Sequence, residues 1–120
     1  MIRAICALVL SAILTGAIGA AHAAEASDWP TRPVRFIVPF PPGGTVDPLA
    51  RLIATRLSAA LGQQFVVDNR TGGSGSIGTA IAAKANPDGY TYVFVFDTHA
   101  VNPSLIHNLP YDTTKDLAPV

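Results

Sequence analysis

Two glycine-bearing segments, residues 39–44 and 68–75, contain the best candidates for binding chemistry in this sequence. Each follows an apolar run and comes shortly before a predicted helix start. Glycine lets a backbone approach a ligand closely, and the first amides of a helix lie unpaired in a positive partial field. Such a pair of segments suits an anionic oxygen group, either carboxylate or phosphate. One segment alone would indicate only a tight turn, whereas two on the same edge of a sheet favour binding.

Three polar side chains near these segments have both a functional and an ordinary interpretation. Asp47, just before Pro48, is expected either to contact a ligand ammonium or hydroxyl or to cap the helix that starts there. Arg70 would attract a ligand carboxylate or pair with Asp68. Thr98 would hydrogen-bond a ligand or cap the turn that follows it. The residue types leave these alternatives open.

The stretch from Gly73 to Gly78 matches the dinucleotide-binding pattern G-x-G-x-x-G, and Asp97 lies about where a ribose-binding acid is expected. This pattern supports a second hypothesis, a fragment of a nucleotide-binding (Rossmann-like) oxidoreductase. The pattern should open directly from a strand, but residues 68–72 come between Val67 and the first glycine. An exported protein would also lie away from cytosolic nucleotides. Both points disfavour the dinucleotide hypothesis.

Signatures of enzymes and metal centres are missing from the sequence. It has no G-x-x-x-x-G-K-[ST] phosphate loop and no G-x-S-x-G nucleophile elbow. His99 and His107 stand apart, with no cysteine or acid at metal-ligand spacing. The 8 basic and 8 acidic residues balance, so no charge excess points to nucleic acid. We therefore expect no catalytic residue, no metal, no cofactor and no nucleic-acid partner.

Residues 1–23 predict a cleavable signal peptide. A positively charged start precedes an apolar run over residues 4–20, and small residues flank a junction after Ala23. Cleavage there would leave residues 24–120 without a cysteine, because Cys6 is the only one. A transmembrane anchor is the alternative. The end of the apolar run is rich in glycine and alanine, which favours cleavage over a stable membrane span. The expected product is periplasmic, with no stable membrane insertion after cleavage.

Alternating apolar patterns predict an α/β architecture. Strands are expected at residues 34–38, 65–67 and 90–96, where β-branched and aromatic residues gather. Helices are expected between them, over residues 47–61 and 76–85. This order implies a parallel sheet with right-handed crossovers. The loops after the strands (residues 39–44, 68–75 and 97–102) should then gather on one edge, where ligands of such sheets bind.

The first predicted helix has an apolar face and a defined end. Gly62 should stop this helix, as a glycine in the left-handed conformation commonly does. Further along, we expect only a helical turn over residues 103–106 and an irregular segment over residues 111–120. The apolar face comprises Leu49, Leu52, Ile53, Leu57, Ala60 and Leu61, which recur at three- and four-residue spacing.

Several short motifs occur in a characteristic order along the chain. They begin with W-P-T-R-P at Trp29 and P-F-P-P-G-G at Pro39, and continue with L-G-Q at Leu61 and D-N-R at Asp68. P-D-G-Y-T at Pro87 follows, and then K-D-L-A-P-V at the end. This series resembles the Bug-type extracytoplasmic solute-binding proteins of tripartite tricarboxylate transporters, from about the first of these motifs onward.

The resemblance implies a two-lobed, periplasmic-binding-protein-like (Venus flytrap) fold. Residues 24–120 would be part of the first α/β lobe, with a mainly parallel sheet and the second lobe missing. It also implies a receptor, not an enzyme, that binds a small carboxylate or related organic solute. The receptor would deliver that solute to the membrane permease subunits of the transporter. A sensor lobe with a signalling partner would use the same pocket and remains an alternative.

Ligand-facing positions can be carried over from the family residue by residue. Because half a flytrap has half a cleft, the chain as given is expected to bind ligand weakly or not at all. The strand-end residues Thr98 and His99 would form the third wall of the pocket. The resemblance implies ligand-binding roles for Phe40, Gly43, Gly44, Asp47, Asn69, Gly73, Gly75, Ser76, Gly78 and Thr98.

Overall fold

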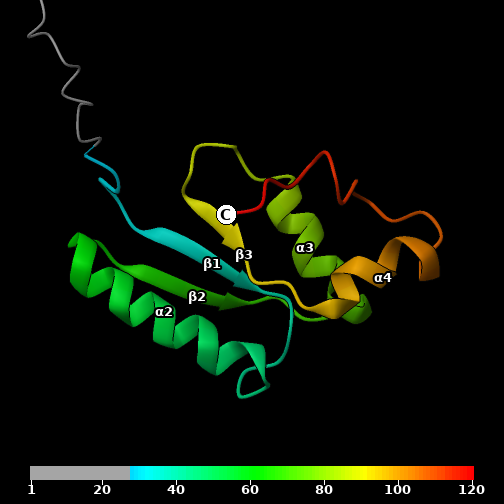
Figure 1. The fold of residues 1–120 in the computed structure, drawn as a ribbon, viewed down its shortest axis with the longest axis horizontal. Coiled ribbons are helices and arrows are strands. Elements are labelled where there is room, and N and C mark those ends of the chain that lie inside the picture. Colours follow the sequence, from blue (N-terminus) through cyan, green and yellow to red (C-terminus); the bar gives the residue numbers. More distant parts are fainter. Residues whose placement is uncertain (1–27) are drawn as a thin grey trace, which may run out of the picture.

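The computed structural model describes residues 28–120, which contain a three-stranded parallel sheet with helices around it (Figure 1). The strands are β1 (Val34–Val38), β2 (Phe65–Asn69) and β3 (Thr91–Val93). Their order is β2-β1-β3, and β1 pairs in parallel with both neighbours. The predicted α/β class with a parallel sheet is therefore confirmed. The predicted signal peptide lies outside the described residues.

In the part of the chain that the structure describes, three α-helices and one short 3₁₀-helix connect and follow the strands. They are α2 (Val46–Leu61), η1 (Gly73–Gly75), α3 (Ser76–Ala83) and α4 (Asp97–Leu105). As predicted, α2 ends at Gly62, which has φ 71° and donates its N–H to the Ser58 carbonyl over 3.1 Å. Within residues 28–120, no helix is long and apolar enough to cross a membrane.

The side chains of β1 alternate between two helical layers. Phe36 and Val38 are buried in clusters with Ala54 and Ala50 of α2. Ile37 points to the opposite face, where it is fully buried and where α3 packs against β1 and β3. Figure 1 shows α2 and α3 on either side of the sheet. Burial on both faces explains why β1 is almost continuously apolar.

Aromatic rings fill the layer between the sheet and α2. The Phe36 ring lies 5.2 Å from that of Phe65 and 4.9 Å from that of Phe94, measured between centroids. Because these rings occupy most of the available volume, the helix approaches through small residues, and Ala50 and Ala54 face the sheet.

This packing corrects the predicted apolar face of α2. Ile53 and Leu57 do pack against the core, as expected. Leu49 and Leu52 instead are 53% and 57% exposed, and Leu61 is also exposed. Leucine spacing alone suggested a face turned away from the true one, since the alanines that fit beneath the aromatic layer carry a weaker hydrophobic signal.

The end of β3 differs from the prediction of a strand over residues 90–96. The regular strand stops at Val93, and the Phe94 N–H makes one further ladder bond to the Ile37 carbonyl (2.9 Å). Val95 and Phe96 then leave the sheet with exposed side chains. The chain enters α4 at Asp97, so residues 97–102 are helical, and the prediction of a loop there is wrong.

The segment before β1 is tied to the start of β3. Trp29 donates from its indole Nε1 to the Gly89 carbonyl (3.0 Å), and its ring packs against Phe65 and Tyr92. The Tyr90 hydroxyl accepts the Thr31 N–H at 3.0 Å. These contacts hold the chain entry at the end of the sheet opposite the glycine-bearing loops.

Candidate functional site

The first two glycine-bearing loops leave the sheet at the same edge, as predicted. β1 ends at Val38 and β2 at Asn69, and these two residues are register partners in the parallel pair. The Arg70 N–H continues the ladder to the Val38 carbonyl over 2.8 Å. Because α2 and α3 both start beyond this edge, their N-termini lie at the same end of the strands, although the helices cover opposite faces of the sheet (Figure 1). We call this end of the sheet the carboxyl edge.

Asp47 does not cap α2, which corrects one of the two sequence interpretations. Thr45 is the N-cap residue, and Asp47 lies inside the first turn with only 4% of its surface exposed. Its Oδ2 accepts the Gly43 N–H and the Arg51 Nε–H, each over 3.0 Å. The carboxylate therefore points back into the first loop and fixes its shape.

Asn69 joins this loop to the end of β2. Its Nδ2 donates to Asp47 Oδ1 and to the Phe40 carbonyl, each over 3.0 Å, and its Oδ1 accepts from Arg51 Nη2 at 3.2 Å. Three side chains thus bond one another pairwise, and we call them the Asp47–Arg51–Asn69 network. The network makes the first loop and the strand end one unit.

The electrostatics of the network keep Asp47 ionised. The hydrogen bond from Arg51, together with those from the Gly43 amide and Asn69, lowers the pKa of Asp47 from 3.8 to about 2. Burial opposes this shift and is outweighed. The carboxylate therefore carries its negative charge at neutral pH and is matched by the guanidinium beside it.

Two glycines let the second loop pack closely against the first. Gly75 has φ 85°, and a Cβ placed there would lie 3.3 Å from the Phe40 ring. A Cβ on Gly78 would lie 2.5 Å from the Arg70 carbonyl oxygen and 2.7 Å from Pro39 Cβ. Both positions require close backbone approach, so α3 starts directly on the ends of β1 and β2.

Most amides of the glycine-bearing loops already have protein partners. The Gly43 N–H donates to Asp47 and the Gly44 N–H to the Pro41 carbonyl at 3.1 Å. In the second loop, the N–H groups of Gly75 and Ser76 donate to the carbonyls of Gly72 and Gly73. Amides that can still meet an anion include those of Val46 and Asp47 in α2 and of Ile77 and Gly78 in α3, which no carbonyl within those helices can reach.

The third candidate wall is a helix start and not a loop. Thr98 lies in the first turn of α4, where its N–H bonds the Asp97 carboxylate at 2.7 Å. The helix reaches the second loop through Asn102, whose Nδ2 donates to the Ser74 carbonyl at 3.0 Å. α4 therefore packs beside η1 in the second loop, while the ring of His99 stacks on that of Tyr111.

Arg70 takes the ordinary role of the two considered for it. Its Nε lies 3.0 Å from the Asp68 carboxylate, which also accepts hydrogen bonds from Arg35 of β1. Burial raises the pKa of Asp68, but the bonds from the two arginines outweigh it and hold the pKa below its usual range. This cluster supports the strand pair, and both Asp68 and Asn69 belong to β2 and not to the predicted loop.

The G-x-G-x-x-G stretch lacks the position that a dinucleotide site needs. It follows the edge strand β2 after three intervening residues, 70–72, and its first three residues form η1. Asp97 is committed to the Thr98 amide at the start of α4. The glycines at 75 and 78 are explained by packing against Phe40 and Pro39.

Two residues of this site were missed by the sequence analysis. Arg51 holds Asp47 and Asn69 together, and its position four residues after Asp47 is a recognisable helical pairing signal. Asn102 connects α4 to the second loop, and no pattern in the sequence marked it. Both act through side chains that bond loop groups.

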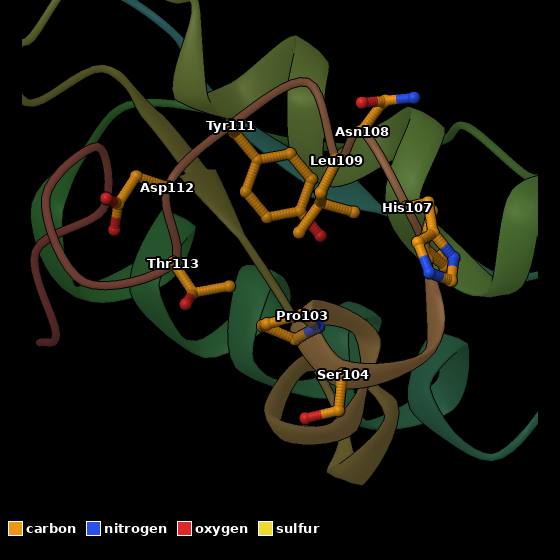
Figure 2. A pocket seen from close by; sticks show the side chains of 9 residues that line it. Pro103, Ser104, His107, Asn108, Leu109, Tyr111, Asp112 and Thr113 are labelled. Atoms are coloured by element: carbon orange, nitrogen blue, oxygen red, sulfur yellow. The ribbon is translucent and has the colours of Figure 1, made fainter.

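A separate hollow of about 700 Å³ lies between α4 and the segment that follows it (Figure 2). Pro103, His107, Tyr111 and Asp112 are among its lining residues. Figure 2 shows the Tyr111 ring among these lining side chains. The hollow includes none of the ten predicted ligand-binding residues, so it does not belong to the carboxyl edge.

Comparison with known proteins places the chain in a family. Residues 49–120, more than half of the chain, match the family described as tripartite tricarboxylate transporter family receptor (TctC). This chain belongs to that receptor family. The chain spans about a third of the length of the curated relatives it matches. The TctC family comprises solute-binding receptors, which agrees with the fold found around the carboxyl edge.

Solved structures of similar proteins support the same fold. The periplasmic binding protein BugD is 39% identical with a TM-score of 0.70, over 73% of this chain and 29% of BugD. MatC from Rhodopseudomonas palustris, with bound malate, is 36% identical with a TM-score of 0.72, over 77% and 32%. An R. palustris protein with adipate is 48% identical with a TM-score of 0.67, over 71% and 29%. The described region is therefore a periplasmic-binding-protein-like α/β unit, and these comparisons give no support to the oxidoreductase hypothesis.

Proposed function

We propose that this chain is the ligand-binding part of a periplasmic receptor that holds a small organic carboxylate for a tripartite tricarboxylate transporter. It binds its solute without transforming it and passes it to the membrane permease subunits. Residues 1–23 act as a cleaved export signal, and residues 24–120 form part of the first lobe. Mass measurement of the protein recovered from the periplasm tests the cleavage, with a new N-terminus at Ala24 expected.

The observation that carries this proposal is the pairing of two helix starts at the carboxyl edge. α2 and α3 both begin beyond the carboxyl edge, and the start of α3 packs against the first loop, with Gly75 on Phe40 and Gly78 on Pro39. Amides in the first turn of a helix attract anionic oxygens through hydrogen bonds and the helix dipole. Two such turns can meet the two oxygens of one carboxylate. The similarity to MatC with malate and to the R. palustris protein with adipate supports this ligand class.

The ligand-binding residues of this proposal divide into two groups. The first-turn residues of α2 and α3, including Asp47 and Gly78, present backbone groups near the ligand, whereas Ser76 shapes the start of α3 because its N–H bonds the Gly73 carbonyl. The side chain of Asn69 acts through the network that holds the first loop. The remaining predicted positions shape the walls of the site, and they are Phe40, Gly43, Gly44, Gly73, Gly75 and Thr98.

A ligand-observed NMR titration of the full 120-residue chain tests the ligand class, because this method detects weak binding. Malate is expected to bind with a dissociation constant of about 1 mM or weaker, corresponding to roughly −4 kcal/mol, since one lobe supplies only part of the contacts. Malamide, the neutral diamide of malate, is the matched control and should not bind. NAD serves as the probe for the oxidoreductase alternative and should not bind either.

Three outcomes would overturn the proposed function, and the first is that the unaltered chain fails to bind malate. Equal binding of malate and malamide would show that the carboxylates are not recognised. Saturable binding of NAD, with none of malate, would favour the nucleotide hypothesis. Cross-linking of the exported receptor in membranes that contain the transporter tests the permease partnership. Recovery of a signalling kinase in place of a permease would contradict that partnership.

A further inference from the structure

Arg51 contacts two parts of the carboxyl edge from a position on the surface of α2. Its side chain is 52% exposed, yet its Nε donates to Asp47 Oδ2 at 3.0 Å and its Nη2 to Asn69 Oδ1 at 3.2 Å. The guanidinium therefore spans from the first turn of its own helix to the end of β2. These two contacts distinguish Arg51 from a surface arginine that contributes only to solubility.

The charge beneath this arginine poses a problem for a receptor of anions. Asp47 is ionised, its side chain is 5% exposed, and it lies in the first turn of α2. An unpaired negative charge there would oppose the positive field of the helix N-terminus, which is the field that would attract a carboxylate. Arg51 supplies the compensating positive charge from the side of the helix.

We propose that Arg51 is a positioning residue for anion binding: it neutralises Asp47 and fixes Asn69, so that the first-turn amides of α2 face the ligand with their positive field intact. This inference rests on the proposed function, since it assigns a role within the same site. Arg51 does not touch the ligand in this account. It acts through Asp47 and Asn69, which hold the Gly43 amide and the Phe40 carbonyl.

The role of Arg51 can be separated from a purely structural one. Asp47 is buried and keeps its bonds from the Gly43 amide and Asn69, so removing the guanidinium should lower stability without unfolding the chain. Malate binding by the folded protein should weaken as well, because the negative charge of Asp47 would lose its compensating partner and act directly on the binding field. A matched control is Arg56→Gln, which removes the same charge from the same helix five residues further along.

The test is a set of malate titrations at neutral pH on the full chain and its variants. Arg51→Gln should weaken malate binding roughly fivefold, the equivalent of about 1 kcal/mol. Arg51→Lys should retain part of the affinity, because it keeps the charge but loses the two-pronged contact. Arg56→Gln should bind malate as the unaltered chain does.

A double substitution decides whether charge is the cause. Asp47→Asn combined with Arg51→Gln removes both charges and should recover part of the affinity that Arg51→Gln loses. Unchanged malate binding by Arg51→Gln would overturn the inference, as would a double variant that binds no better than Arg51→Gln. If Arg56→Gln weakened binding equally, general charge attraction would replace the specific role. Failure of the unaltered chain to bind malate would instead remove the proposed function and this role with it.

Discussion

Replacing Gly78 by alanine should destabilise the domain, although alanine is the better helix former. The added Cβ would lie 2.5 Å from the Arg70 carbonyl oxygen, 2.7 Å from Pro39 Cβ and 2.9 Å from Pro39 Cα. Two of these three atoms belong to the backbone, and the third is in a proline ring, so none can rotate away. α3 would have to move off the ends of β1 and β2 by nearly an ångström.

The expected magnitude follows from two opposing effects. Overpacking a well-packed contact costs about 1–3 kcal/mol. Replacing a helical glycine by alanine gains roughly 0.5–1 kcal/mol. The net result should be a loss of about 0.5–2 kcal/mol in the free energy of unfolding, obtained by subtracting the lower bounds and the upper bounds of the two ranges. The same movement would separate the two helix starts, so malate binding should weaken as well.

Urea unfolding followed by the fluorescence of Trp29 measures this loss. Trp29 is the single tryptophan, and its ring packs 6.2 Å from Phe65 at the far end of the sheet, so it reports on the whole fold. Ala82→Gly in the same helix is the matched control, since it should cost about 0.5–1 kcal/mol through helix propensity alone. A Gly78→Ala variant as stable as the original chain, or more stable, would refute the close packing of α3.

Three further predictions concern single side chains. Asp47 has a lowered pKa in the folded state, so its stabilising contribution is present above its ordinary value of 3.8 and is lost as the pH falls toward about 2. Asp47→Asn should therefore flatten the acid dependence of urea midpoints in that window, and an unchanged pH profile would contradict the network. Asn69→Ala should cost about 1–3 kcal/mol of unfolding free energy, because Asp47 Oδ1 and the Phe40 carbonyl lose their donor. Arg32→Ala, which breaks an exposed ion pair with Asp88, should change the free energy of unfolding by less than about 1 kcal/mol. A larger loss in thermal unfolding would show that the segment before β1 contributes more to the stability of the fold.

Local chemistry in the sequence was sufficient to predict the framework of this fold. The β-branched run of β1 marked a buried strand at the correct residues, Val34–Val38. Gly62 marked the end of α2, because its positive φ is one that glycine adopts without strain. The alternation of strands and helices then fixed the parallel sheet, and with it the shared edge of the first two loops.

Features that depend on packing in three dimensions were not predictable in the same way. The face of α2 that meets the sheet is set by the rings of Phe36 and Phe65, which leave room for alanines and not for Leu49 or Leu52. β3 ends early because Phe96 leaves the sheet and α4 begins beside η1. Neither fact is encoded in the spacing of apolar residues along one element.

The site shows the same division between local and tertiary information. The predicted parallel sheet implied that the first two loops share one edge, which the register of β1 and β2 confirms. The partners of Asp47 could not be predicted in full, because Asn69 lies at the end of β2 and meets Asp47 of α2 only in the folded structure. Arg51 is the exception, since its spacing from Asp47 was visible in the sequence.

An amide-resolved NMR titration of the full chain with malate tests the central claim most directly, because it identifies which backbone groups meet the ligand. The account predicts that the largest shifts fall on the first-turn amides of α2 and α3, at Val46, Asp47, Ile77 and Gly78, and that malamide leaves them unchanged. Shifts concentrated around Tyr111 in the separate hollow, with the two helix starts unaffected, would contradict the claim that the carboxyl edge binds the anion.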